Sequence, residues 1–568
     1  MNPSTAQARV LIDELARGGL RDAVIAPGSR SAPLTLASDQ HPDVTVHVEI
    51  DERSAAFLAV GIARATGRPA AVICSSGTAA ANFHPAVVEA AYARVPLVVL
   101  TADRPPELRA TGANQTIDQP GLYGATTRWA VDLSVAEERA GQVAYWRSIV
   151  ARLLAEAAGR PAGPVHCNVG LREPLVPDGT DDWVEPLDGR AGGRAWTARV
   201  VDLALPTPAD VALIAGEVAA HPRGALVLGD VEVDPVVVAG FAAAAGWPVV
   251  AEPHSGARTG DHVVSTADLL LADARFADAH RPDLAIVVGR PVLTRAVRRW
   301  LDGVARTIVV DADGAWLDPG RTVERILRAA PTALLRDVTD RFDDHRVTHF
   351  LAQWQHAERA ARHVVDDLLD GCGEPTEPRV ARDLAACVPD GAVLVAGSSM
   401  PIRDLSAVMR PRHGLRVFGN RGASGIDGFV STVLGVAIGH DGPVAGLCGD
   451  LSFLHDQNGF LLAGARALDA VFVVINNDGG GIFSLLEARQ VDGFDRLFGT
   501  PHGIGLATLA ATYELAYHPL ARAADLADVV TTAFDAGGLH VIEVRTDREE
   551  NAALHRELTA RVAAAVTG

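Results

Sequence analysis

The sequence predicts an α/β protein built from three doubly wound parallel sheets. Short apolar runs alternate with amphipathic segments, which is the pattern of strands and helices around a buried parallel sheet. The chain has 568 residues, which suits about three domains of ~150–200 residues each. The same alternation recurs in three consecutive blocks, and we place their boundaries at residues 1–187, 188–375 and 376–568.

Composition is typical of a globular protein and argues against several partners. Hydrophobic residues make up 48% of the chain and charged residues 21%, which is not the composition of a disordered protein. A net charge of −19 argues against nucleic acid or an anionic membrane as a main partner. A local group of arginines can still bind a small anionic substrate, because net charge does not set the sign of each site.

The sequence gives no indication of export or membrane insertion. The N-terminus lacks a basic stretch followed by an apolar core, and no apolar run reaches the length of a membrane span. The five cysteines are scattered and form no CxxC pair, as expected of buried thiols in a reducing compartment. We therefore expect a cytoplasmic protein.

The first block is expected to hold helices over residues 6–17 and 54–65 together with four strands. The strands are expected at 22–26, 44–50, 70–74 and 96–101. Each ends in a polar turn, and the ligands of an open parallel sheet bind at the carboxyl ends of its strands. The turns after these strands are therefore candidate binding segments.

The second and third blocks follow a stretch rich in Gly, Arg and Pro, residues 183–207, which we interpret as a linker. In the second block, strands are expected at 225–229, 248–251, 284–289 and 307–311. In the third block, strands are expected at 392–396, 415–418, 444–448, 471–475 and 540–544.

Residues 449–483 carry the clearest functional pattern. Asp450 follows one predicted strand and Asn477 follows the next, with a helical segment between them. Both side chains are therefore expected at one edge of a parallel sheet. With the backbone carbonyl of Gly479 they form an oxygen-only set that suits Mg²⁺ or Mn²⁺.

Two ordinary turns would also explain these residues, since Gly, Asp and Asn are common in turns. The paired placement at two strand ends favours the metal site. The glycines at 479–481 let backbone N–H groups approach a phosphate closely. A phosphate-bearing ligand with a divalent ion is therefore the preferred interpretation.

Four arginines lie just past predicted strand ends. They are Arg30, Arg104, Arg403 and Arg421. Any one alone is explained by a surface position or by an ion pair, for which Asp103 and Asp404 are adjacent candidates. Because arginine binds carboxylates in a bidentate manner, four in equivalent places indicate a site that holds several carboxylates.

Several segments resemble a known enzyme family. The pairs Gly-Asp at 449–450 and Asn-Asn at 476–477 are similar to the diphosphate and metal motif of thiamine-diphosphate (ThDP) enzymes, although Leu451 stands where that motif most often has Gly. Six segments together resemble the 2-succinyl-5-enolpyruvyl-6-hydroxy-3-cyclohexene-1-carboxylate synthase family, the ThDP enzymes of menaquinone biosynthesis. They are residues 27–33, 75–79, 102–105, 112–115, 420–428 and 479–484. The segment 420–428 is the most specific of them, and the middle block matches mainly in architecture.

The resemblance implies a fold, a reaction and an assembly. The three blocks would be an N-terminal pyrimidine-binding domain, a central α/β domain and a C-terminal diphosphate- and metal-binding domain. With ThDP, the enzyme would decarboxylate 2-oxoglutarate and add the resulting carbanion to isochorismate in 1,4 fashion, releasing CO₂. The family also implies a homodimer or homotetramer in which the first block of one chain faces the third block of another.

The resemblance also assigns roles to residues. Glu52, between the end of a predicted strand and the helix that follows, would hydrogen-bond the pyrimidine ring and activate the cofactor, although the helix dipole alone also favours an acidic residue there. Metal ligands would be Asp450, Asn477 and the Gly479 carbonyl. Cofactor-binding residues would be Ser399, Ser424, Ile426, Gly449, Asp450, Leu451 and Asn477, with Ile426 wedged between the two cofactor rings. Substrate-binding residues would be Ser29, Arg30, Arg104, Asn114, Gln115, Arg295, Arg403, Arg421, Ile482 and Phe483.

Some alternatives stay open from the sequence. Arg295 takes a position where the family often has Lys, which preserves the charge but not the geometry. Another ThDP carboligase, similar to acetolactate synthase, would share Glu52, Asp450 and Asn477 without needing the arginines. A non-catalytic ThDP- or nucleotide-binding regulator is a further alternative. A dinucleotide-dependent dehydrogenase is disfavoured, because no GxGxxG motif opens a helix after a strand.

Overall fold

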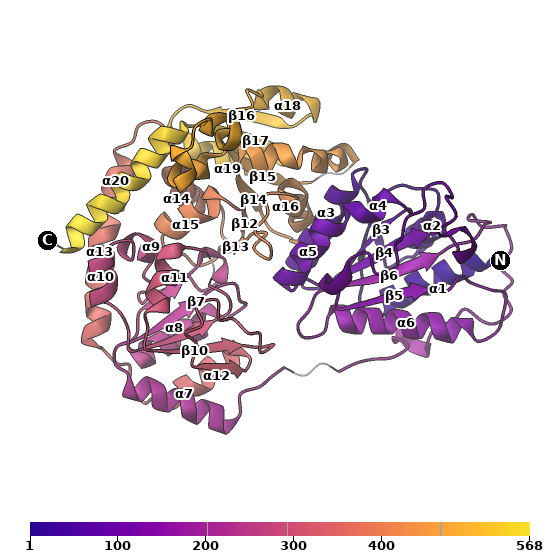
Figure 1. Ribbon diagram of the computed structural model, residues 1–568, viewed down its shortest axis with the longest axis horizontal. Helices are drawn as coiled ribbons and strands as arrows, with labels where there is room; N and C mark the ends of the chain where they lie inside the picture. The colour runs from indigo at the N-terminus through magenta and orange to yellow at the C-terminus, as the bar shows by residue number, and fades with distance from the viewer. Residues whose placement is uncertain (201–202, 292, 466–467, 568) are drawn as a thin grey trace. The chain divides into compact units, whose positions relative to one another are not determined.

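The computed structural model describes residues 1–200, 203–291, 293–465 and 468–567, and these fold into three parallel sheets (Figure 1). The first sheet has the strand order β2-β1-β3-β4-β6-β5, and the third has the order β13-β12-β14-β15-β17-β16. Numbered within each sheet, both orders are the same. The second sheet, β11-β10-β9-β7-β8, has the same central order with one strand fewer. The predicted fold class, three doubly wound parallel sheets, is confirmed.

The density of internal contacts divides the chain into two compact units. The first comprises Met1–Val201, Asn420–Val444 and Ser452–Ala470. The second comprises Asp202–Gly419, Ala445–Leu451 and Val471–Gly568. The domain boundaries placed at residues 187/188 and 375/376 stay predictions.

The first unit is built around the first sheet. Its strands are β1 (Asp22–Ile25), β2 (Thr45–Val48), β3 (Ala70–Cys74), β4 (Leu97–Asp103), β5 (Trp129–Leu133) and β6 (Pro164–Gly170). Its α-helices are α1 (Pro3–Arg17), α2 (Ala32–Gln40), α3 (Glu52–Thr66), α4 (Thr78–Asn82), α5 (His84–Ala93), α6 (Gln142–Ala157) and α16 (Phe429–Gly439). Helices α1, α2 and α6 share one apolar core with the strands, and α3, α4 and α5 cover the other face (Figure 1).

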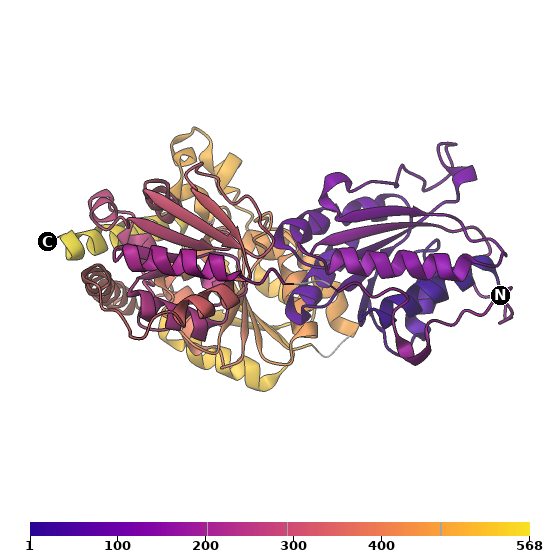
Figure 2. The same ribbon diagram turned by 90° about the horizontal axis from the view of Figure 1, so that it is seen from below.

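The second unit holds the other two sheets. The second sheet has β7 (Gly224–Leu228), β8 (Val249–Ala251), β9 (Leu284–Val288), β10 (Arg306–Asp311) and β11 (Arg325–Arg328). Its helices are α7 (Pro208–Ala220), α8 (Pro235–Ala245), α9 (Ala267–Leu270), α10 (Ala274–Ala279), α11 (Arg295–Asp302), α12 (Pro331–Thr339) and α13 (His349–Asp370). Helices α7, α8 and α12 pack on one face, while α9, α10, α11 and α13 pack on the other. Figure 2 shows α6 and α7 in front of the first and second sheets.

The third sheet contains β12 (Val393–Ala396), β13 (Arg416–Phe418), β14 (Val444–Gly449), β15 (Ala470–Asn476), β16 (Ala516–Leu520) and β17 (Leu539–Arg545). Its helices are α14 (Glu377–Cys387), α15 (Met400–Val408), α18 (Leu506–Thr512) and α19 (Leu526–Ala536). Helix α20 (Arg548–Thr567) packs into the core that α9, α10, α11 and α13 form on the second sheet. Helix α17 (Asp450–His455) starts where β14 ends, and the 3₁₀ segment Gln457–Ala465 follows it. Residues 466–467 of the predicted helical segment lie outside the described residues.

Four strands escaped prediction, and their positions explain why. Strands β5, β11 and β16 each lie at an edge of their sheet. An edge strand buries less apolar surface than a central one, so its sequence carries a weaker hydrophobic signal. Strand β6 is central, but it buries His166 and Asn168 among its apolar residues. The predicted linker at 183–207 is irregular apart from a short 3₁₀ turn, and its residues 201–202 lie outside the described residues.

Helices α3 and α16 approach unusually closely because each has a glycine at the crossing. A Cβ atom on Gly61 would lie 2.3 Å from the Thr432 carbonyl oxygen, and one on Gly435 would lie 2.2 Å from the Leu58 carbonyl oxygen. Real Cβ atoms do not approach so closely, so both positions require glycine. This contact fixes helix α16 against helix α3, which begins at Glu52.

Candidate active site

Three loops converge at the carboxyl edge of the first sheet. A Cβ atom on Gly28, after β1, would lie 2.3 Å from the Ser75 Cβ, after β3. Gly77 approaches Gln115 in the same way, at 3.0 Å from its Cγ. The predicted turns at 27–31 and 75–78 therefore touch, and the 112–115 segment joins them. We call these three loops the N-terminal cluster.

Hydrogen bonds tie the N-terminal cluster together. The Ser76 hydroxyl donates to the Gln115 carbonyl (2.9 Å), and the Gln115 side-chain amide donates to the Ser76 carbonyl (2.9 Å). Arg104, after β4, donates from Nη1 to the Ser76 Oγ (2.8 Å). Gln115 has a φ of +54°, which residues other than glycine adopt rarely. The predicted residues Arg104 and Gln115 therefore share one site, and Asn114 is adjacent to it.

Arg30 and Arg104 form the electropositive part of this cluster. Arg30 is buried and donates from Nη1 to the Leu171 carbonyl (3.0 Å), while Ser29 beside it is exposed. Burial lowers the pKa of Arg30, and repulsion from the Arg104 guanidinium lowers that pKa further. Glu173 and Asp103 oppose the shift. The Arg30 Nη2 lies 3.6 Å from the Glu173 Oε1, and the two guanidinium groups together suit a bound anion.

A buried polar network that the sequence did not predict lies below Arg104. Asn168 on β6 donates from Nδ2 to Asp103 (2.9 Å) and to Asp132 (2.8 Å), and its Oδ1 accepts from Gln119 (2.9 Å). Gln119 also accepts from the Gly77 backbone N–H (2.8 Å). Arg109, rather than Arg104, pairs with the Asp103 carboxylate at 3.0 Å. Asp103 therefore does not neutralise Arg104 through an ion pair, and the network supports the turn that carries Gly77.

Glu52 is the first residue of α3, two residues before the predicted helix start. The Asp51 side chain caps the helix by accepting from the N–H groups of Arg53 and Ser54, which explains the earlier start. The Glu52 carboxylate lies near the end of β3, where its charge adds to burial in raising the pKa of Cys74. Glu49, which was not predicted, is 1% exposed. Burial raises the pKa of Glu49 to about 8.

The 420–428 segment is anchored to helix α5 by a residue that the sequence did not reveal. The buried Glu89 carboxylate accepts from the backbone N–H groups of Gly422 and Ala423, both at 2.7 Å. Gly422 is packed so tightly that a Cβ would lie 2.4 Å from the Glu89 carbonyl oxygen. Arg421 is buried, Ser424 has a φ of +63° and Ile426 is half-buried. These three predicted residues thus lie on one rigidly held loop of the first unit.

In the second unit, Asp450 and Gly479 meet at the carboxyl edge of the third sheet, as predicted. Asp450 Oδ2 accepts from the Gly479 N–H (2.9 Å) and lies 3.3 Å from the His502 Nε2. Burial raises the pKa of Asp450, although these bonds oppose the shift. Gly449 ends β14, and Leu451 follows Asp450 in α17. His502 comes from a distant loop, so the sequence carried no signal for it.

Asn477 has the geometry of a metal ligand with one free oxygen. Its Nδ2 donates to the Glu377 Oε1 (2.8 Å), and its Oδ1 is buried without a hydrogen-bond partner among the described residues. Gly479 adopts a φ of +138°, and a Cβ there would lie 1.9 Å from the Gly499 carbonyl oxygen. The carboxylate, the unpartnered amide oxygen and the adjacent glycine backbone fit a hard divalent cation.

The predicted Ser399, Arg403 and Arg295 lie near one another in the same unit. Ser399 combines a φ of +77° with a ψ of −128°, angles that a residue with a side chain rarely adopts. Arg403, one turn into α15, donates from Nη1 to the Ser399 carbonyl. Burial lowers the pKa of Arg403 first, and the charge of Arg295 at the start of α11 lowers it further. Arg295 itself is exposed. Asp404 pairs with His555 at 3.0 Å rather than with Arg403.

Ile482 and Phe483 lie in a 3₁₀ segment, Gly481–Leu485, and both are half-buried. The Phe483 ring packs on the Phe498 ring with centroids 5.5 Å apart. The Gly480 N–H, just before this segment, donates to the Gly499 carbonyl (2.8 Å) and anchors it. The structure therefore presents both predicted residues next to the Asn477–Gly479 turn.

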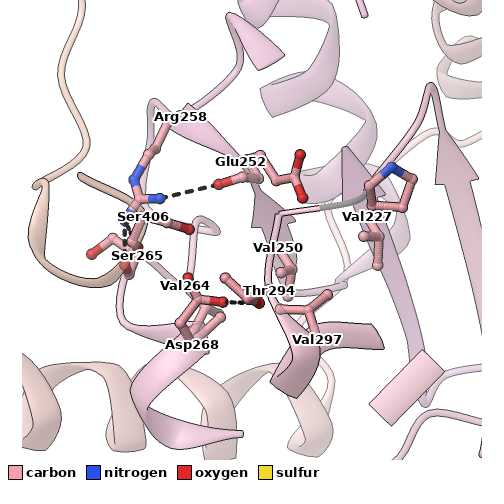
Figure 3. Close-up of a pocket in the computed structure, with 13 residues that line it drawn as sticks. Val227, Val250, Glu252, Arg258, Val264, Ser265, Asp268, Thr294, Val297 and Ser406 are labelled. Carbon is pink, nitrogen blue, oxygen red and sulfur yellow. Dashed lines mark hydrogen bonds between the residues drawn. The ribbon is translucent and has the colours of Figure 1, made fainter. Parts of the chain in front are cut away.

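A pocket in the second unit contains none of the predicted site residues (Figure 3). Arg258 lines this pocket, is buried, and donates to the carbonyl oxygens of Ala251, Ser265, Ser406 and Met409. Burial lowers the pKa of Arg258 to about 10. Its donors join the second sheet to helix α15, which is a structural role.

Comparison with known proteins defines the class of protein first. Residues 6–122 match the N-terminal TPP binding domain of thiamine pyrophosphate enzymes, and residues 401–544 match the C-terminal TPP binding domain of the same class. Thiamine pyrophosphate and ThDP are the same cofactor. The chain is thus a ThDP-type enzyme, and its two matched regions include Arg30, Arg104 and Gln115 in the first and Asp450, Asn477 and Gly479 in the second.

Full-length relatives then define the family. A protein from Thermobifida fusca is 50% identical over 574 residues, covering 100% of both chains. Relatives from Saccharopolyspora erythraea (42% identical, 100% of both chains) and Bacillus velezensis (39%, 98% of this chain and 97% of the relative) are also similar. All three relatives are named 2-succinyl-5-enolpyruvyl-6-hydroxy-3-cyclohexene-1-carboxylate synthase. The chain belongs to the 2-succinyl-5-enolpyruvyl-6-hydroxy-3-cyclohexene-1-carboxylate synthase family. In the described part of the chain, no helix is both long and apolar enough to span a membrane.

Proposed function

We propose that this chain catalyses the ThDP-dependent decarboxylation of 2-oxoglutarate and the 1,4-addition of the resulting four-carbon unit to isochorismate. The products are 2-succinyl-5-enolpyruvyl-6-hydroxy-3-cyclohexene-1-carboxylate and CO₂, in menaquinone biosynthesis. Family membership supports the reaction. The observation that carries the substrate class is the Arg30–Arg104 pair, because two mutually repelling guanidinium groups at a strand edge suit substrates with several carboxylates.

The proposed cofactor contacts begin with the metal ion. Asp450, the Asn477 Oδ1 and the Gly479 carbonyl would hold Mg²⁺ or Mn²⁺. Bound ThDP supplies an electron sink that makes loss of CO₂ and formation of the new carbon–carbon bond possible. Glu52 would hydrogen-bond the pyrimidine ring and move its proton. The remaining cofactor contacts would come from Ser399, Ser424, Ile426, Gly449 and Leu451.

The substrates are bound by the arginines and by their polar neighbours. Arg30, Arg104, Arg403 and Arg421 would bind carboxylates, and Arg295 adds charge near Arg403. Asn114, Gln115 and Ser29 would orient polar groups of the substrate, while Ile482 and Phe483 supply an apolar wall that excludes water. We further propose that the protein is cytoplasmic and acts as a homodimer or homotetramer.

The test is release of CO₂ from carboxyl-labelled 2-oxoglutarate with ThDP and Mg²⁺, measured with and without isochorismate in the wild type and in Glu52→Gln. Isochorismate-dependent turnover that collapses in the variant supports the cofactor, the donor and the acceptor together. Turnover of pyruvate without turnover of 2-oxoglutarate would overturn the proposed reaction and leave the ThDP class standing. Binding of ThDP without any turnover would point to a regulator.

A further inference from the structure

Glu377 is a buried carboxylate with no part in the proposed reaction. It begins helix α14 and is 3% exposed. Its Oε1 accepts two hydrogen bonds, from the Asn477 Nδ2 (2.8 Å) and from the Thr546 Oγ1 (3.1 Å). A carboxylate oxygen only accepts hydrogen bonds, so it selects the NH₂ end of Asn477 rather than the carbonyl end.

The orientation of Asn477 follows from that selection. With Nδ2 held by Glu377, Oδ1 points the other way, where it is buried and has no hydrogen-bond partner among the described residues. Burying a carbonyl oxygen without a partner costs ~1–3 kcal/mol. Such a cost persists where the oxygen serves a ligand, and the neighbouring Asp450 and Gly479 identify that ligand as a cation.

We propose that Glu377 is a positioning residue that fixes the Asn477 amide with its oxygen toward the metal ion. This inference rests on the proposed function, because it takes Asn477 as a metal ligand. Partners that orient the ligands of a metal typically change its affinity 10–100-fold when they are mutated. We therefore expect Glu377→Gln, whose amide can face either end of Asn477, to weaken Mg²⁺ binding by ~10-fold or more.

The experiment is titration of Mg²⁺ into the full-length protein by isothermal calorimetry at saturating ThDP, with thermal unfolding of each metal-free variant recorded alongside. The decisive comparison is a swap. In Asn477→Asp the new carboxylate faces Glu377, and repulsion between the two weakens the site. In the double variant Glu377→Gln/Asn477→Asp, the introduced amide donates to the introduced carboxylate and restores binding. Glu377→Gln must therefore weaken Mg²⁺ binding in the wild-type background and strengthen it in the Asn477→Asp background.

The chain offers a matched control one residue away. Asn476 donates from Nδ2 to the Glu543 Oε1 (2.6 Å), and Glu543 is 1% exposed. The pair repeats the Asn–Glu hydrogen bond of Glu377 and Asn477 without a proposed metal ligand, and Glu543 also accepts from Arg545 (3.1 Å) and Tyr517. We expect Glu543→Gln to leave the Mg²⁺ Kd unchanged. An equal loss of Mg²⁺ affinity in Glu543→Gln and Glu377→Gln would mean that removing any nearby buried carboxylate weakens Mg²⁺ binding. That result would overturn the inference.

Failure of the inference and failure of the proposed function give different results. If Asn477→Ala leaves the Mg²⁺ Kd unchanged, the proposed metal ligand is wrong, and the inference falls with it. If Asn477→Ala weakens binding while Glu377→Gln does not, only the inference is overturned. If Glu377→Gln alone does not fold, the double variant still decides, since it must bind Mg²⁺ more tightly than Asn477→Asp.

Discussion

Ser399 shows at the scale of one residue how the site is shaped against local preference. Its φ of +77° and ψ of −128° belong to a region that glycine occupies freely and serine does not. Gln115 and Ser424 also have positive φ, and all three were predicted as site residues from sequence motifs. Strained backbone of this kind persists where a function selects the side chain. The roles predicted for these three residues stay predictions.

The strain at Ser399 predicts a gain in stability on substitution. Ser399→Gly is expected to raise the free energy of unfolding by ~1 kcal/mol, because a positive φ costs ~1–3 kcal/mol for a residue with a side chain. Ser406→Gly in the same helix is the control and is expected to lower it by ~0.5–1 kcal/mol. Thermal unfolding measures both. A loss of stability in Ser399→Gly equal to that in Ser406→Gly would contradict the strain.

Arg104 predicts an effect on substrate binding at the same scale. Arg104→Lys keeps the charge but loses the second donor of the guanidinium fork. We expect KM for a carboxylate substrate to rise ~10-fold, since hydrogen bonds between charged groups contribute ~1.5–3 kcal/mol. Steady-state kinetics measures this, with the exposed Arg152→Lys as a control. An unchanged KM in Arg104→Lys would remove Arg104 from the substrate site.

At the scale of elements, helices α3 and α16 of the first unit cross in close contact. Gly61 and Gly435 let the two helix backbones touch, and no side chain larger than a hydrogen atom fits at either position. The pattern of apolar residues predicted helix α3 but not this contact. A glycine inside a helix lowers the stability of that helix, so from the local sequence it counts against a helix. Packing against helix α16 offsets this cost, and α16 lies more than 360 residues further along the chain.

The crossing predicts the sign of two glycine substitutions. Gly61→Ala places a Cβ 2.3 Å from the Thr432 carbonyl and is expected to lower the free energy of unfolding by ~1–3 kcal/mol. Gly216→Ala in helix α7 meets nothing within 4 Å and is expected to raise it by ~0.5–1 kcal/mol. Urea unfolding followed by circular dichroism measures the pair. Equal effects of the two substitutions would rule out the close packing.

At the scale of the whole molecule, buried carboxylates make stability depend on pH. Burial raises the pKa of Glu49 to about 8, above its ordinary value of 4.5. Between these two values the folded state holds a proton that the unfolded state has lost. Stability from this group is therefore fully present below about pH 4.5 and is lost as the pH rises toward 8.

The pH dependence predicts the behaviour of Glu49→Gln. The variant carries no ionisable group at this position, so its Tm should rise relative to that of the wild type as the pH goes from about 5 to about 8.5. Burial also lowers the pKa of His166 to about 4, so His166 changes the stability of both proteins at lower pH. Because both proteins contain His166, the difference between their Tm values reports Glu49 alone. Thermal unfolding across that range measures it. A constant difference in Tm would show that Glu49 ionises freely.

Much of the fold and part of the site were accessible from the sequence. Apolar runs that end in polar turns located the central strands other than β6, because a strand buried on both faces has apolar residues in succession. The motifs at those strand ends placed Arg30 and Arg104 after strands of the first sheet and Asp450 and Asn477 after strands of the third, while their roles stay predictions. The edge strands β5, β11 and β16 were missed, since they bury too little to leave the same pattern.

Only the tertiary structure decided which groups support the site. Glu377 reaches Asn477 from 100 residues away, Glu89 holds Gly422 from 333 residues away, and His502 approaches Asp450 from another loop. A local motif records the residue types that chemistry needs at a strand end. Tertiary packing brings the partners that orient those residues from segments with no periodicity or spacing in common. No local sequence pattern therefore predicts them.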